Sequence, residues 1–240
     1  MKKVLVVFVL GMFTITQVWS QKSAVVQIGA KAPSFTAMST NGKIKFPQDF
    51  GSSWKVLFAH PKDFTPVCSS EILELAHAQK SLKEMNVEVA VISTDILGQH
   101  NSWKAALEEL TYKDRSPVKI EFPIIADEDM KISQQYGMIH NATSTVQNIR
   151  GVYIINPDNL ISSIYFYPNE VGRNLDELKR TLTALQTTYA YQNVLTPANW
   201  QKGDDVIVPV LTKAEREEIN KPGSMYNEVA WFMIFKELKF

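Results

Sequence analysis

Short apolar runs alternate with helical patterns through residues 55–126, and this alternation limits the possible folds more than any other feature of the chain. Residues 55–60 (KVLFAH), 87–93 (VEVAVIS) and 122–126 are short, apolar and bounded by turn residues, which is typical of buried strands. Residues 69–82 repeat apolar side chains at helical spacing between the first two runs. A strand, a helix and a second strand in succession form a parallel pair with a right-handed crossover. The segment therefore predicts a sheet with a parallel core.

The second half of the chain adds an antiparallel edge to this sheet. Trp103, Leu107 and Leu110 mark a further helix. Residues 150–156 and 160–167 are apolar runs separated by a Pro-Asp-Asn turn, which predicts a hairpin. Residues 175–189 form a last helix, and Asn174 is its expected N-cap. The predicted fold class is α/β, a thioredoxin-like mixed sheet flanked by helices.

The first 20 residues have the pattern of a signal peptide. Lys2 and Lys3 form a basic start, residues 4–15 are an almost unbroken apolar run, and Ser20 is small enough to precede a cleavage site. A run of twelve residues is too short to span a bilayer comfortably. We therefore expect an exported protein, periplasmic or secreted, that begins at Gln21. An uncleaved membrane anchor or a buried strand is the alternative interpretation.

Composition excludes several function classes. Lys and Arg together number 25, and so do Asp and Glu, so no basic surplus is available to bind a nucleic acid. The chain has one cysteine, which rules out an intrachain disulfide and a four-cysteine zinc site. Its four histidines show no metal-ligand spacing, and no glycine-rich nucleotide motif occurs. We expect neither a metal nor another cofactor.

The single cysteine lies where its chemistry would be activated. In the stretch HPKDFTPVCSSE, residues 60–71, a buried strand ends, a loop follows, and a helix begins near Cys68. Free backbone N–H groups and the helix dipole favour a thiolate in the first turn of a helix. Thr65, three residues earlier, can hydrogen-bond the sulfur or an oxygen bound beside it. A buried cysteine that only fills space is the alternative, and the position of Cys68 argues against it.

Pro61, Thr65 and Cys68 fit the pattern P-x-x-x-T-x-x-C, and the chain resembles a peroxiredoxin of the one-cysteine subfamily. HPKDFTPVC is similar to that subfamily's own version of the motif. Four later stretches resemble the subfamily in the same order, namely FPIIAD, RGVYIINP, YPNEVGRNLDE and TPANWQKGDDVIVP. The resemblance covers residues 28–210 and weakens after Val210.

The resemblance implies a role for each residue of the motif. Cys68 would be the peroxidatic nucleophile, which attacks the peroxide and becomes a sulfenic acid. Thr65 would bond the thiolate and the peroxide oxygen, Arg150 matches the family's essential arginine, and Pro61 would shield the sulfur. Together they would form the catalytic site.

Three further residues are candidates for a supporting role. Glu71 and Arg173 match positions that in the family help to orient the site. Their alternative interpretations are an ordinary acid in the first turn of a helix and a solvated surface arginine. His60 lies near the thiol and could tune it, although a histidine that only packs or hydrogen-bonds is the other interpretation.

The resemblance divides the mature chain into a thioredoxin-like peroxiredoxin domain, residues 28–188, and a C-terminal arm, residues 189–240. Prolines punctuate the arm, a short strand is predicted at residues 205–208, and the chain ends in the aromatic-rich MYNEVAWFMIFKELKF. The arm would be a dimerisation arm in a homodimer or higher homo-oligomer. Packing of the aromatic end onto its own domain is the alternative.

These observations predict a thiol-dependent peroxidase that reduces hydrogen peroxide and organic hydroperoxides and serves antioxidant defence and redox homeostasis. No second cysteine can resolve the sulfenic acid, so an external thiol or another electron donor must reduce it. The alternative function is a peroxide sensor or chaperone-like redox switch without significant turnover. A sensor needs a reactive thiol but not the complete peroxide site that Thr65 and Arg150 would form.

Overall fold

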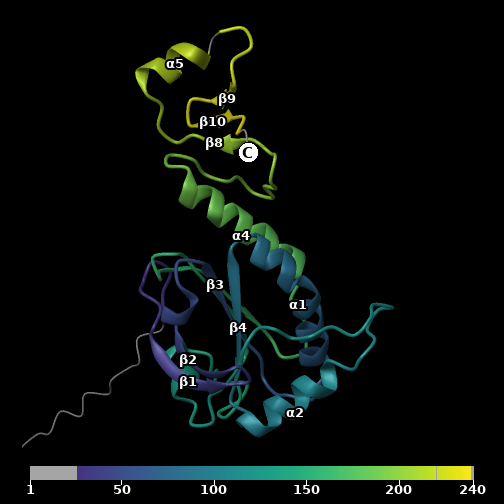
Figure 1. The fold of residues 1–240 in the computed structure, drawn as a ribbon. Coiled ribbons are helices and arrows are strands. Elements are labelled where there is room, and N and C mark those ends of the chain that lie inside the picture. Colours follow the sequence, from purple (N-terminus) through teal and green to yellow (C-terminus); the bar gives the residue numbers. More distant parts are fainter. Residues whose placement is uncertain (1–25, 220, 239–240) are drawn as a thin grey trace, which may run out of the picture.

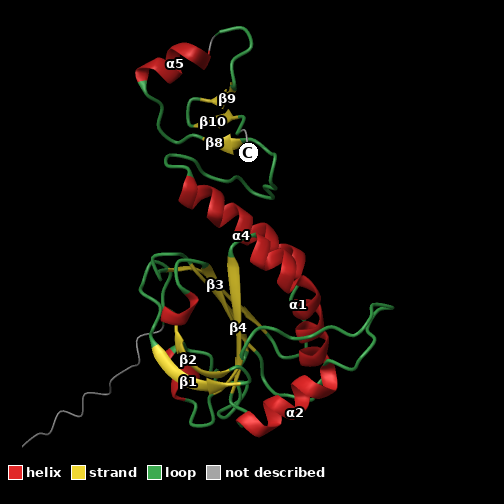
Figure 2. Cartoon of the chain, in the orientation of Figure 1, coloured by secondary structure: helices red, strands yellow, loops and turns green. Residues whose placement is uncertain are grey.

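The computed structural model describes residues 26–219 and 221–238, so the expected signal peptide lies outside the described residues. A seven-stranded sheet in the order β2-β1-β5-β4-β3-β6-β7 forms the centre of the molecule (Figures 1 and 2). Its strands are β1 (Phe35–Ser39), β2 (Gly42–Phe46), β3 (Trp54–Ala59), β4 (Val87–Ser93), β5 (Ile124–Ala126), β6 (Arg150–Ile155) and β7 (Ile161–Tyr167). The helices of this part are η1 (Gln48–Phe50), α1 (Pro66–Glu84), α2 (Leu97–Leu107), α3 (Lys131–Gln135) and α4 (Leu175–Ala190). This mixed sheet with flanking helices confirms the predicted thioredoxin-like fold class.

Strand β3 lies inside the sheet, between β4 and β6, and its side chains are buried on both faces. It pairs in parallel with β4 and antiparallel with β6, and Val56 lies opposite Val89 on one side and Ile154 on the other. One face of the sheet packs against α1 and α4, which lie side by side (Figure 1). The carboxyl end of β3 leads into the loop of residues 60–65, and this loop leads into α1, whose first turn holds Cys68.

The predicted elements are present with shifted ends. The helix expected at residues 69–82 begins earlier, at Pro66, whose fixed φ suits the first helical position. The expected β6–β7 hairpin is antiparallel, and the Asn174 side chain caps α4 by accepting from the N–H groups of Asp176 and Glu177. The hairpin β1–β2 and helix α3 were not predicted from the sequence. β1 joins the sheet through Ser39, which pairs with Ile125 of β5.

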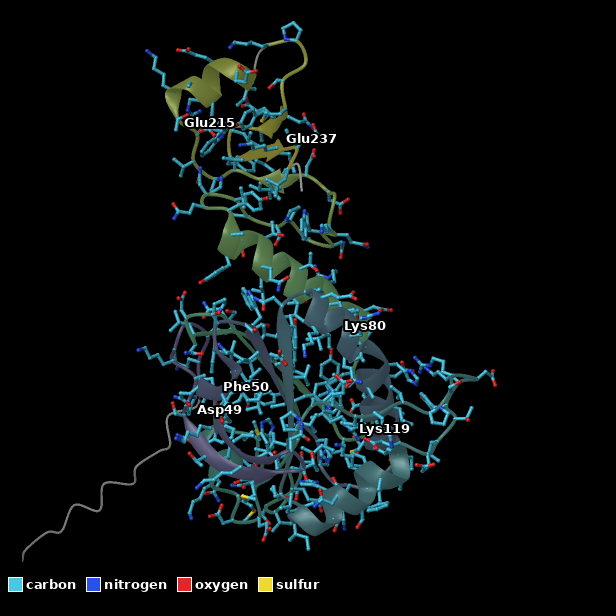
Figure 3. The ribbon with its side chains drawn as sticks, in the orientation of Figure 1. Asp49, Phe50, Lys80, Lys119, Glu215 and Glu237 are labelled. Atoms are coloured by element: carbon cyan, nitrogen blue, oxygen red, sulfur yellow. The ribbon has the colours of Figure 1, made fainter. Side chains whose placement is uncertain are left out.

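The chain after α4 forms a small arm at the far end of that helix from the main sheet (Figure 1). It contains a three-stranded sheet, β8 (Val206–Ile207), β10 (Met233–Lys236) and β9 (Tyr226–Ala230) in that order, and helix α5 (Lys213–Ile219). The predicted strand at residues 205–208 is confirmed as β8, whereas the β9–β10 hairpin was not predicted. Figure 3 labels Glu215 and Glu237 on this arm.

The arm has a small core and an exposed aromatic turn. Val208, Leu211, Tyr226 and Ile234 pack together in its interior. Trp231 and Phe232, at the turn between β9 and β10, keep 80% and 67% of their surface exposed. No helix in the described part of the chain is long and apolar enough to cross a membrane.

Candidate active site

Cys68 lies in the first turn of α1, as predicted, and its side chain is completely buried. Thr65 is the N-cap residue with an extended backbone, and Pro66 occupies the first helical position, where its missing N–H costs nothing. Backbone N–H groups at this end of the helix have no partner within the helix, and the helix dipole is positive there. Both effects favour a negatively charged sulfur.

Arg150, the first residue of β6, extends its guanidinium to the sulfur. Its Nη1 lies 3.2 Å from Cys68 Sγ and 2.7 Å from Glu71 Oε2. Its Nε and Nη2 donate to the backbone carbonyl of Asn169 at 3.0 and 2.6 Å. The side chain is 3% exposed, so the guanidinium is held in one orientation away from water.

Glu71 and Arg173 form the layer behind Arg150. Glu71 Oε1 accepts from the Nε and the backbone N–H of Arg173, both at 2.8 Å, and Oε2 accepts from Arg173 Nη2 at 2.7 Å. Arg173 Nη1 donates to the carbonyls of Ala59 and Gly151, and the guanidinium lies 3.2 Å from the centre of the Phe58 ring. The alternative interpretations of Glu71 as an ordinary first-turn acid and of Arg173 as a solvated arginine are therefore wrong.

The charges of this buried group favour an anionic sulfur. Burial by itself raises the pKa of Glu71, but the hydrogen bonds and charge of Arg173 and the charge of Arg150 outweigh it and hold the pKa below its usual range. Burial lowers the pKa of Arg173, and Glu71 opposes that change. Two guanidinium groups and one carboxylate leave one positive charge in excess, and a thiolate at Cys68 would neutralise it.

The two other motif residues border the cysteine loop. Pro61 is buried two residues after the end of β3, while Thr65 is partly exposed. The Thr65 hydroxyl donates to the carbonyl of Lys62 at 2.9 Å in this structure, which leaves its oxygen free to accept from a bound peroxide. The expected bond between Thr65 and the sulfur stays a prediction.

His60 belongs to a buried polar cluster that the sequence did not reveal as a unit. Its Nε2 lies 2.8 Å from Asp63 Oδ1, and His100 Nδ1 of α2 lies 2.6 Å from Asp63 Oδ2. Burial lowers the pKa of His60, although Asp63 opposes this. Burial raises the pKa of Asp63, but hydrogen bonds from His100 and His60 outweigh it, so the pKa lies below its usual range.

Among the described residues, His60, Asp63 and Asp95 are the group whose ligand atoms lie close enough for a metal ion, within 4.8 Å of one another. Their carboxylate oxygens are already occupied by protein donors. Asp95 accepts from the backbone N–H of Asp63 and from the side chains of Ser93 and Gln99. The carboxylate oxygens thus have protein partners, whereas Nδ1 of His60 has no hydrogen-bond partner among the described residues.

A depression of about 650 Å³ opens beside Thr65 on the surface of the molecule. Lys62, Asp63, Phe64, Ile96 and Gln99 are among its lining residues. Phe64 and Ile96 expose 56% and 54% of their surface there. Phe64 also has a positive φ of 56°, a left-handed conformation that is unfavourable for a bulky residue, so the surrounding contacts must hold the loop.

Two family models match the chain. The model of the AhpC/TSA family matches residues 28–164, and the model of the C-terminal domain of 1-Cys peroxiredoxin matches residues 184–218. A peroxiredoxin of Methanosarcina mazei is 42% identical over 213 residues, which cover 88% of this chain and 97% of that protein. Peroxiredoxin 2 of Caldanaerobacter subterraneus is 41% identical over a match that covers 88% of this chain and 93% of that protein.

Solved structures agree with these relatives. A yeast mitochondrial 1-Cys peroxiredoxin, described with a thiol resolving mechanism via glutathione/thioredoxin systems, has a TM-score of 0.77 at 33% identity. The match covers 89% of this chain and all of that one. A cysteine-to-serine mutant of peroxiredoxin 6 from Arenicola marina also has a TM-score of 0.77, at 32% identity, and covers 90% of this chain and all of its own.

Proposed function

The chain belongs to the AhpC/TSA family of peroxiredoxins, and from that premise we propose that it reduces peroxides through Cys68 alone. It is a thiol-dependent peroxidase with an antioxidant function. The observation that carries the choice of nucleophile is the 3.2 Å contact between Arg150 Nη1 and Cys68 Sγ at the buried start of α1. Turnover is favoured over a sensing role because a switch needs no guanidinium fixed at the sulfur.

The first step oxidises the cysteine by two electrons. The thiolate sulfur of Cys68 attacks one peroxide oxygen and forms an S–O bond while the O–O bond breaks. The other oxygen leaves with the bonding electrons and takes up a proton as water or an alcohol. Cys68 becomes a sulfenic acid. Negative charge develops on the leaving oxygen, and the guanidinium of Arg150, already fixed by Glu71 and Asn169, can stabilise it without reorganising.

The neighbouring residues then have distinct proposed roles. The Thr65 hydroxyl oxygen would accept from the peroxide at the N-cap of α1, and Pro61 would keep water from the sulfur. Glu71 and Arg173 would hold Arg150 in position. The exposed Phe64 and Ile96 offer an apolar surface to the organic part of a hydroperoxide.

The second step needs a thiol from outside the chain. Cys68 is the one cysteine in the sequence, so no second sulfur of the same molecule can attack the sulfenic acid. An external thiol would displace water to give a mixed disulfide, and a second thiol would release the disulfide and regenerate Cys68. We propose an external thiol as the reductant class.

We also propose that the arm mediates a homodimer. Trp231, Phe232 and Val229 expose a group of apolar side chains around the β9–β10 turn, and such groups are often covered by another chain. Sedimentation velocity of the full chain and of a Trp231→Lys variant tests this. A dimer that the substitution weakens would support the proposal, whereas a monomer over the micromolar range would contradict it.

Export is proposed on the sequence of the first 20 residues. The basic start, the apolar run and Ser20 before Gln21 support cleavage and a periplasmic or secreted location. Expression with the native N-terminus, followed by cell fractionation and N-terminal sequencing, would give a product that begins at Gln21. An intact N-terminus in the membrane fraction would identify the segment as an anchor instead.

A steady-state assay tests the enzymatic proposal. Hydrogen peroxide and an organic hydroperoxide are each supplied with a panel of small thiols and a thioredoxin, and peroxide consumption is followed. We expect turnover by the unchanged protein and none by Cys68→Ser, in which a weaker nucleophile of nearly the same size replaces the thiol. Turnover by the serine variant would remove Cys68 from the mechanism.

A further inference from the structure

Three side chains without exposed surface form a chain of hydrogen bonds under the cysteine loop. They are His60 at the end of β3, Asp63 in the loop, and His100 in α2. Asp63 lies between the two imidazoles and offers one carboxylate oxygen to each, at 2.8 and 2.6 Å. The cluster thus joins the loop that precedes Cys68 to a helix that follows it in the sequence.

The positions of the hydrogens follow from the partners. His100 Nε2 lies 3.1 Å from the backbone carbonyl of Ile125, and a carbonyl only accepts, so this nitrogen carries a hydrogen. An ionised Asp63 also only accepts, so His100 Nδ1 and His60 Nε2 each carry one as well. Both ring nitrogens of His100 then donate, one to Asp63 and one to Ile125. His60 is neutral, with its second nitrogen, Nδ1, unprotonated.

That second nitrogen of His60 has no hydrogen-bond partner among the described residues, and it is buried. The His60 ring packs against Trp103, with 5.0 Å between the ring centres. The Trp103 Nε1 donates to the hydroxyl of Ser69, which directly follows Cys68 in α1. In the tautomer that Asp63 selects, His60 Nδ1 is therefore a buried acceptor without a partner among the described residues. It belongs to the ring that packs on Trp103, which in turn bonds the first turn of α1 at Ser69.

Asp63 also fixes the backbone of the loop. Its N–H donates to Asp95 at 2.8 Å, which ties the loop to the segment between β4 and α2. The next residue, Phe64, has the unfavourable positive φ, and Thr65 is then the N-cap residue of α1. A conformation of this kind persists only when the surrounding contacts hold it.

We propose that Asp63 and His100 are positioning residues for the peroxidase reaction, which fix the tautomer of His60 and the conformation of the loop that carries Thr65 and leads to Cys68 in α1. This inference rests on the proposed function of Cys68. The titratable groups that face His60 are Asp63 from its own loop, His100 from α2 and Asp95 from the segment before α2. The other neighbours of the cluster, Trp103 and the Ile125 carbonyl, are uncharged.

Two substitutions of His100 test the proposal. His100→Leu removes the donor to Asp63, while His100→Asn places an amide N–H near the position of Nδ1. We expect the leucine variant to lose about tenfold to a hundredfold in kcat/KM for peroxide, the range expected for loss of a buried hydrogen bond to a charged group. We expect the asparagine variant to keep most of the rate.

A second readout separates positioning from a loss of stability. Burial lowers the pKa of His60, and a charge on His100 lowers it further, so removal of that group in His100→Leu should raise the pKa. Titration of the ring protons by nuclear magnetic resonance, assigned with single-histidine variants, measures this directly. An unchanged His60 titration in His100→Leu would overturn the proposal, as would an equal loss of rate in His100→Asn.

Matched controls complete the experiment. His77→Leu replaces a histidine of α1 outside the cluster and should leave kcat/KM unchanged. Asp127→Asn alters a buried carboxylate that caps α3 through Ile132 and Ser133, so it should lower stability without lowering the rate. An equal loss of rate in Asp127→Asn would overturn the proposal. Absence of turnover in the unchanged protein would instead refute the proposed function itself.

Discussion

Replacing Glu71 with Gln removes the only carboxylate that touches both arginines behind the cysteine among the described residues. The carboxylate is 2% exposed and receives hydrogen bonds from both guanidinium groups and from the Arg173 backbone. An amide of the same size presents one acceptor oxygen and one NH₂ group, and the NH₂ must face a guanidinium that also donates. The variant thus loses both a charge and part of its hydrogen bonding.

The structure gives the magnitude of the expected loss. Removing one partner of a buried ion pair leaves an uncompensated charge and costs about 3–5 kcal/mol. Here two buried guanidinium groups, Arg150 and Arg173, lose their shared counter-ion. For a chain of this size each kcal/mol corresponds to about 2–4 °C in Tm, so the variant should melt about 6–20 °C lower. The peroxidase rate should also fall because Arg150 is no longer held at Cys68.

Urea unfolding at several pH values is the assay. The pKa of Glu71 in the folded protein lies below its ordinary value of 4.5, so its stabilisation is fully present above that value and is lost as the pH falls through the folded pKa. The free energy difference between the unchanged protein and Glu71→Gln should therefore shrink in acid. Near neutral pH, a difference in the free energy of unfolding below about 1 kcal/mol would be as small as that of a surface substitution and would refute the reasoning. So would a difference that does not change with pH.

Two further predictions follow from the same geometry. Arg150→Met should lower kcat/KM by more than about 30-fold, since an ordinary thiol is about 3% ionised near pH 7 and full ionisation can gain no more than that factor. A smaller loss in a peroxide-reduction assay would confine Arg150 to stabilising the thiolate. Stability should fall as the pH drops below about 6.5, because burial lowers the pKa of His60 in the folded protein and the unfolded chain binds the proton first. A His60→Gln variant should lose this part of the pH dependence in urea unfolding, and an unchanged profile would contradict it.

The strands at the centre of the sheet could be predicted because their sequences are almost entirely apolar. Nearly every side chain of β3 and β4 is buried, so a run of Val, Leu, Phe and Ile is enough to indicate a strand there. The β1–β2 hairpin has no such signal, since its strands FTAMS and GKIKF mix polar and apolar residues and lie at the edge. Ile44 and Phe46 of β2 are buried, whereas Met38 of β1 stays exposed.

The candidate site divides in the same way. Cys68, Thr65 and Pro61 lie within one short motif, so local sequence and resemblance place them together. The partnership of Glu71 with Arg173 joins residues 102 positions apart, and that of Asp63 with His100 joins residues 37 positions apart. Neither pair has a spacing that indicates contact. Only the fold brings α1 against the segment before α4, and the cysteine loop against α2.

Oxidation of the reduced protein by one equivalent of hydrogen peroxide, followed by intact-mass spectrometry and peptide mapping, tests the central claim most directly. The claim is that Cys68 is the nucleophile and that no other sulfur of the chain resolves its product. We predict one added oxygen atom, located at Cys68, and then two and three as the peroxide rises in excess, because the sulfenic acid has no partner cysteine in its own chain. A disulfide-linked dimer through Cys68 with no added oxygen at low peroxide would contradict the account, as would a Cys68 that stays reduced.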